Sequence, residues 1–198
     1  MTVDERLLVR KRKKARTIRL FRKIHRQTAV FLFVAFFIMA GTGLLLGWKK
    51  NSGGILLAPT EKGTSSNMAE WLPLDSLTNL AVTFLHDSVS ASLSPEIDRI
   101  DVRPDKGIVK FTFTNHYKGL QVDGATGKIL RVEQRVADLI EHMHDGTILD
   151  RIFETGNGIF KLIYSTVTGL ALLIFTITGV WLWLGPKRLH SMKQPGKQ

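Results

Sequence analysis

The chain has 198 residues, of which 44% are hydrophobic and 23% charged, and it contains no cysteine. The absence of cysteine excludes disulfides, thiolate nucleophiles and cysteine-ligated metals. The net charge of +11 is concentrated at the two ends, because residues 1–26 sum to +9 and residues 187–198 to +4. The middle of the chain is therefore slightly acidic.

Two long uncharged stretches predict membrane-spanning helices. No charged residue occurs from Gln27 to Trp48 or from Leu162 to Gly185. A helix rises 1.5 Å per residue, so about 20 apolar residues cross the hydrocarbon core. Basic residues mark the cytoplasmic side, so we expect both termini in the cytoplasm and the middle on the far side.

The first stretch is longer than the apolar core of a signal peptide and lacks a small-x-small cleavage site after it, which predicts an uncleaved anchor. The basic run Arg10–Arg16 could alternatively bind nucleic acid. Its position directly before a span favours contact with anionic lipid headgroups instead, so we expect the bilayer and not nucleic acid as its partner.

These features predict five segments. They are a basic cytoplasmic segment, a first span, a central domain with its linker, a second span and a basic cytoplasmic tail. Their boundaries are 1–26, 27–48, 49–158, 159–185 and 186–198.

The residue pattern of the central domain predicts one helix followed by an antiparallel sheet. The helix begins at Asp75-Ser76, and its apolar residues recur at helical spacing. These residues are Leu77, Leu80, Ala81, Phe84 and Leu85. Apolar residues then alternate with polar ones in four strands, near residues 100–102, 109–113, 117–122 and 128–133. We expect the helix to cover the apolar face of this sheet.

Two further segments complete the predicted α+β membrane fold. Residues 49–72 read as a linker or an extended cover strand. A second helix begins at Val136 and returns towards the membrane.

Small residues within and beside the spans predict close helix packing. Gly43 and Gly47 form a GxxxG pattern, and Ser165 with Gly169 forms its small-residue relative. Gly179 lies in a Thr-Gly pair that echoes the one at Thr42-Gly43. Packing could join the two spans or two protomers, and chance is the alternative because glycine is common in membrane helices.

Several motifs together resemble a known family. The hairpin Val122–Leu130 (VDGATGKIL) is similar to the signature hairpin of PepSY domains. The flanking motifs Arg22–Arg26, His144–Gly146 and Thr178–Trp183 resemble those of the PepSY-associated transmembrane family, in the same order along the chain. The resemblance covers residues 20–188 and indicates the short, two-helix form.

The resemblance implies a bacterial inner-membrane protein with a periplasmic PepSY-like domain. Larger relatives include reductases that release iron from siderophores and hold haem b between membrane helices through histidines. We therefore expect an accessory or binding module in iron and siderophore uptake. The alternatives are a haem-binding electron-transfer subunit and, because PepSY domains elsewhere inhibit or chaperone proteases, a protease-regulating module.

His25 and His144 are the candidate haem ligands. They lie at opposite ends of the predicted spans, about 30 Å apart, so they cannot ligate one iron within a single chain. A homodimer would pair each with its symmetry mate, and a larger membrane partner is the other possibility. The alternatives are an interfacial anchor for His25 and a helix-end residue for His144. No catalytic residue and no metal site are predicted, and any reductase activity would require haem.

Overall fold

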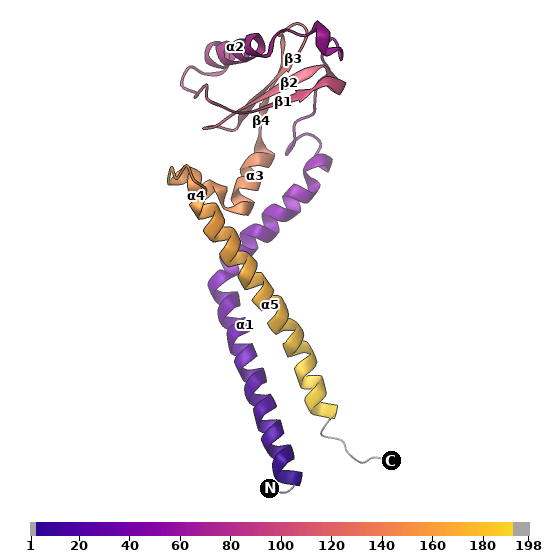
Figure 1. The fold of residues 1–198 in the computed structure, drawn as a ribbon, viewed down its shortest axis with the longest axis vertical. Helices are drawn as coiled ribbons and strands as arrows, with labels where there is room; N and C mark the ends of the chain where they lie inside the picture. Colours follow the sequence, from indigo (N-terminus) through magenta and orange to yellow (C-terminus); the bar gives the residue numbers. More distant parts are fainter. Residues whose placement is uncertain (1–2, 192–198) are drawn as a thin grey trace. The chain divides into compact units, whose positions relative to one another are not determined.

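The computed structural model describes residues 3–191 and contains two compact units. The helical unit combines residues up to 41 with residues from 143, and the sheet unit contains residues 42–142. The elements are shown in Figure 1. The helices are α1 (Val3–Trp48), α2 (Leu74–Phe84), α3 (Val136–Asp145), α4 (Thr147–Ile152) and α5 (Ile159–Ser191). The strands are β1 (Ile97–Arg103), β2 (Ile108–Phe113), β3 (Lys118–Asp123) and β4 (Ile129–Gln134).

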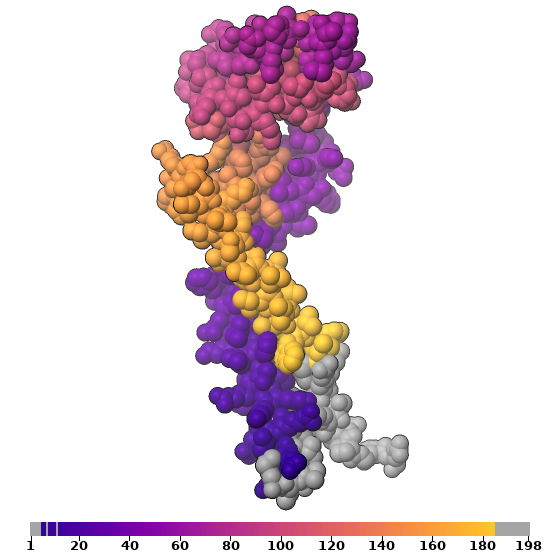
Figure 2. All heavy atoms as spheres, in the orientation of Figure 1, coloured from indigo at the N-terminus to yellow at the C-terminus, as the bar shows by residue number. Residues whose placement is uncertain are grey.

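The sheet unit confirms the predicted α+β arrangement. Its four strands are antiparallel in the order β1-β2-β3-β4, with Phe111 opposite Leu120 in the centre. Helix α2 lies over one face of the sheet, where its purple atoms cover the pink strands (Figure 2). Leu77 and Ala81 of the helix and Leu85 directly after it are buried, as predicted, whereas Leu80 is 44% exposed. The helix ends in a π turn, Leu85–Val89, that the sequence pattern did not predict.

The hairpin between β3 and β4 is held by its own turn residues. The Asp123 carboxylate accepts hydrogen bonds from the backbone N–H groups of Ala125 (3.0 Å) and Thr126 (3.4 Å). Gly127 has φ +71°, a conformation that side chains disfavour, and an added Cβ would lie 2.5 Å from Leu80. These requirements explain Asp123 and Gly127 in this turn.

Residues 56–65, called the strap here, cross the other face of the sheet as an extended segment. The side chain of Gln121 donates to the carbonyl of Pro59 (2.9 Å) and accepts from the N–H of Glu61 (2.8 Å). Further along, the N–H of Thr64 donates to Asp123 (3.0 Å). The strap therefore covers the β3–β4 half of the polar face and leaves the β1–β2 half open.

The helical unit is an antiparallel hairpin of α1 and α5. Phe21 stacks on Trp181 at one end, with ring centroids 5.4 Å apart, and His144 reaches the carbonyl of Met39 at the other. Both helices are long and apolar enough to span a membrane, as predicted. The chain enters α1 and leaves α5 at the same end of the hairpin, since the two helices run in opposite directions.

Candidate functional site

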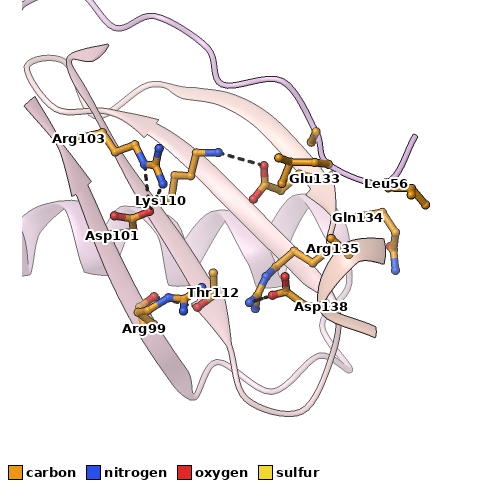
Figure 3. Close-up of a pocket in the computed structure, with 13 residues that line it drawn as sticks. Leu56, Arg99, Asp101, Arg103, Lys110, Thr112, Glu133, Gln134, Arg135 and Asp138 are labelled. Atoms are coloured by element: carbon orange, nitrogen blue, oxygen red, sulfur yellow. Dashed lines mark hydrogen bonds and ion pairs between the residues drawn. The ribbon is translucent and has the colours of Figure 1, made fainter. Parts of the chain in front are cut away.

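A polar groove occupies the open half of the sheet face opposite α2. It is a cavity of about 110 Å³ between the strap residues Leu56–Ala58 and the side chains of β1, with β2 as its floor and the end of β4 and start of α3 as its far wall (Figure 3). Successive side chains of β2 point to opposite faces of the sheet, and this two-residue period determines which of them line the groove. Val109, Phe111 and Phe113 point into the core, so Lys110 and Thr112 point into the groove.

The floor of the groove contains a lysine whose side chain is largely buried and whose ammonium opens into the groove. Lys110 is 9% exposed, and its Nζ lies 3.7 Å from Oε2 of Glu133, which is beyond hydrogen-bond distance. The same Oε2 accepts a hydrogen bond of 2.7 Å from Gln121. Among the residues that the structure describes, Lys110 therefore has a carboxylate nearby but no acceptor at hydrogen-bond distance.

The rim of the groove contains three arginines. Arg103 pairs with Asp101 at 2.7 Å, and Arg135 pairs with Asp138. Arg99 makes no ion pair within the described part of the chain, and in Figure 3 it extends towards Arg135. The lining includes four basic and three acidic side chains in all. The Arg103–Asp101 pair is exposed, and such pairs contribute about 0–1 kcal/mol, so a ligand's anion can compete for Arg103 at little cost.

The His-Asp-Gly motif of residues 144–146 connects three helices of the helical unit. His144 Nδ1 donates to the carbonyl of Met39 in α1 (3.1 Å). The Asp145 carboxylate accepts from the N–H of Thr147 at the start of α4 (2.9 Å) and pairs with Lys161 of α5 (2.6 Å). Burial alone would raise the pKa of Asp145, but these bonds hold it below the usual range.

Gly146 completes this motif through its conformation. Its φ is +84°, and an added Cβ would lie 2.7 Å from the ring of Tyr164 in α5. Only glycine combines this left-handed backbone with so close an approach to the ring. The motif therefore holds the α3–α4 connection against both α1 and α5.

Asp150 of α4 caps the first turn of α5. Its two carboxylate oxygens accept from the backbone N–H groups of Phe160 (3.1 Å) and Lys161 (2.7 Å), and Thr155 donates through its hydroxyl (2.6 Å). Burial by itself would raise the pKa of Asp150, but these donors lower it. The sequence analysis missed this residue, because a cap contributed from outside the helix has no fixed spacing to it.

Comparison with known proteins identifies the family. The family described as PepSY-associated TM region matches residues 2–185, which include both spans and the sheet unit. The chain belongs to this family. It is therefore a PepSY-associated membrane protein with two transmembrane helices. No curated protein and no solved structure matches the chain.

In this family member, His25 contacts the second span. Its Nδ1 lies 2.8 Å from the hydroxyl oxygen of Thr178. That hydroxyl donates its own proton to the carbonyl of Ile174 (2.7 Å), so His25 Nδ1 must be the donor. With Nδ1 as the donor, Nε2 is the ring nitrogen not used in this contact. The ring also stacks on Phe175, with centroids 3.8 Å apart.

The two candidate haem ligands share this tautomer. His144, like His25, donates through Nδ1, and histidines that bind metals commonly do so while Nε2 coordinates. Nε2 of each ring is therefore the atom that would ligate a haem iron. Fourteen residues separate His25 from Met39, which His144 contacts, so the two imidazoles lie about 21 Å apart along α1. This is less than the predicted separation, because His144 lies beside the span, but still too far for one iron.

The five small residues occupy different environments. Gly179 lies at the contact with α1, where an added Cβ would be 3.6 Å from the His25 ring. Ser165 donates to the carbonyl of Asp145 (3.3 Å). Gly169 has open space where a Cβ would stand, so its predicted packing role would involve another chain. Gly43 and Gly47 belong to the sheet unit, and their packing stays a prediction.

Proposed function

We propose that this PepSY-associated chain is a non-catalytic binding module of the bacterial inner membrane, accessory to iron and siderophore uptake. The α1–α5 hairpin anchors it, and the sheet unit faces the periplasm. There the groove receives an extended segment of a partner protein. The observation that carries this proposal is the groove itself, a polar cavity into which the Lys110 ammonium opens.

The position of the groove supports an extended ligand. It lies beside β1, an edge strand of the sheet, and edge strands accept further strands from partners. The charged residues Asp98, Arg99, Asp101 and Arg103 alternate along β1, which opposes indiscriminate pairing with other edges. A module that regulates or chaperones a protease would use the same surface.

Blocking the groove tests the binding function. The full-length chain in lipid nanodiscs would be used to select ligands from a random heptapeptide library. Ala58 lines the groove, so Ala58→Trp should abolish binding of the selected peptides. Thr83→Trp, at an exposed position of α2, should leave it unchanged. Failure to select any peptide, or equal binding by both variants, contradicts the proposal.

The pathway is tested separately by growth. Deletion of the gene should slow growth when a ferric siderophore is the sole iron source, and the Ala58→Trp variant should fail to restore it. Growth of the deletion strain at the normal rate would remove iron uptake from the proposal.

A second candidate function is electron transfer by a haem-binding dimer, favoured by the shared tautomer of His25 and His144. Haem b bound there would supply one-electron transfer across the membrane. His25 and His144 would provide Nε2, and Thr178 and the Met39 carbonyl would orient the two rings.

Visible absorbance tests this candidate. Protein from haem-replete cells should show a Soret band that is lost in the double variant His25→Ala, His144→Ala. Thr178→Val should shift or weaken the band, whereas Thr176→Val should not, because Thr176 donates to Leu172 within α5. Colourless wild-type protein contradicts haem binding.

A further inference from the structure

Lys110 is the cation at the floor of the groove. Its side chain is only 9% exposed, and its ammonium opens into the cavity, where a bound ligand can reach it. Lysine side chains are rarely covered to this extent without a partner. Its neighbour Glu133 is 3.7 Å away and already accepts a hydrogen bond from Gln121. Glu133 therefore balances the charge of Lys110 but does not accept a hydrogen bond from it, so the ammonium retains donors for a ligand in the groove.

We propose that Lys110 binds a carboxylate side chain of an acidic, extended peptide segment lying in the groove. This inference rests on the proposed binding function and names the chemistry of its ligand. The ligand carboxylate would accept a hydrogen bond from the Lys110 ammonium at the floor, and the positive charge of Arg99 at the rim would attract it. Such charge-assisted bonds are stronger than those between neutral groups.

The charge distribution in the sheet unit supports an acidic ligand. Residues 42–142 contain eleven basic and twelve acidic side chains, so the unit as a whole has one more acid than base. The groove lining reverses this balance, with four basic and three acidic side chains. Each acid in the groove has a basic neighbour, which leaves Arg99 as the cation without an ion pair among the described residues.

The size of the cavity limits what can enter it. A volume of about 110 Å³ admits a single side chain, because drug-sized ligands occupy cavities of roughly 300–1,000 Å³. One aspartate or glutamate of a bound segment would fill it, with the rest of that segment running along β1. A free small carboxylate has the same chemistry, so the test must separate the two sources.

The test measures binding of matched peptides to the full-length chain in nanodiscs. One heptapeptide carries a central glutamate between serines and threonines, and its partner carries glutamine there. We expect the glutamate peptide to bind at least tenfold more tightly, the size of one charge-assisted hydrogen bond. Acetate should compete only weakly, since it lacks the main-chain contacts with β1.

Variants that remove one positive charge show which side chains recognise the glutamate of the peptide. Lys110→Gln should remove the preference for glutamate, and Arg99→Gln should reduce it. Arg99 is on the exposed rim, so this second variant retains the fold even where the first does not. Lys106→Gln removes the same charge from an exposed turn of the same unit and should leave the preference intact.

The outcomes distinguish a failure of acid recognition from a failure of the proposed binding function. Equal binding of both peptides, with loss of binding in Ala58→Trp, would overturn acid recognition and retain the groove as a peptide site. A preference that survives Lys110→Gln and Arg99→Gln would likewise overturn it. No binding of any peptide by the wild type would overturn the proposed function as well, and competition by acetate as strong as by the peptide would make the ligand a free carboxylate.

Discussion

The sheet unit and the helical unit bury opposite kinds of residue. The largest fully buried side chains, including Phe111, Phe113 and Leu77, all lie in the sheet unit. The buried residues of the helical unit are small or polar, such as Thr168, Ala171 and Thr178. The large apolar side chains of α5 are exposed in the protein, where lipid replaces water.

This contrast shows how the solvent decides which contacts hold each unit together. In water, apolar burial drives the sheet and α2 together. Between membrane helices that driving force is absent, so close packing and hydrogen bonds determine association. The polar motif around Gly146 and the bond between His25 and Thr178 have this role in the hairpin.

The largest expected effect is loss of the apolar core in the sheet unit. Phe111→Ala removes a fully buried ring between β2 and α2 and should destabilise this unit by about 3–5 kcal/mol. Urea unfolding followed by the near-UV signal of Trp71 would measure it. Val132→Ala, at a position 41% exposed on β4, should cost far less, and equal losses would contradict the assigned core.

The second-largest loss of stability is expected in the helical unit. Gly146→Ala introduces a Cβ at φ +84° and 2.7 Å from Tyr164, so we expect a loss of about 1–3 kcal/mol. Resistance of the hairpin to unfolding in denaturing detergent measures this loss. Gly156→Ala is the matched control, because an added Cβ there meets nothing within 4 Å. Indistinguishable variants would mean that the motif does not hold the hairpin.

Acid should weaken the sheet unit through Asp123. Burial alone would raise the pKa of this carboxyl, but the hydroxyl of Thr64 and the N–H groups of Ala125, Thr126 and Thr64 hold it below the usual range. Its stabilising effect is therefore complete above the unfolded pKa of about 3.9 and is lost as the pH falls through the folded value. Asp123→Asn should flatten this part of a stability–pH curve, and an unchanged slope would contradict the assignment.

The smallest expected effect separates binding from stability. Arg99→Gln changes an exposed side chain without an ion pair in the described chain, so unfolding should shift by less than about 0.5 kcal/mol. Thermal unfolding of the variant should therefore match that of the wild type. A large shift would assign Arg99 a structural role and weaken the groove as a site.

Local patterns in the sequence predicted the elements but not the contacts between distant ones. The two-residue period of β2 and the helical stripe through Leu77 and Ala81 were sufficient to place the sheet and its covering helix. Asp150 caps α5 from a neighbouring helix, and Gln121 bonds to the strap from a position 62 residues along the chain. Both contacts join different elements, so no local pattern encodes them. The His144 motif was recognised, but its bond to Met39 depends on how the spans pair.

The most direct test of the central claim is the labelling of single cysteines, which the cysteine-free chain allows. The claim is that a membrane hairpin holds the groove on the side opposite the termini. Asn115→Cys, in the exposed β2–β3 turn, should react with a membrane-impermeant maleimide in cells whose outer membrane is permeabilised. Arg12→Cys, exposed on α1, should react only after the inner membrane is opened. Labelling of both cysteines under the same condition would contradict the account.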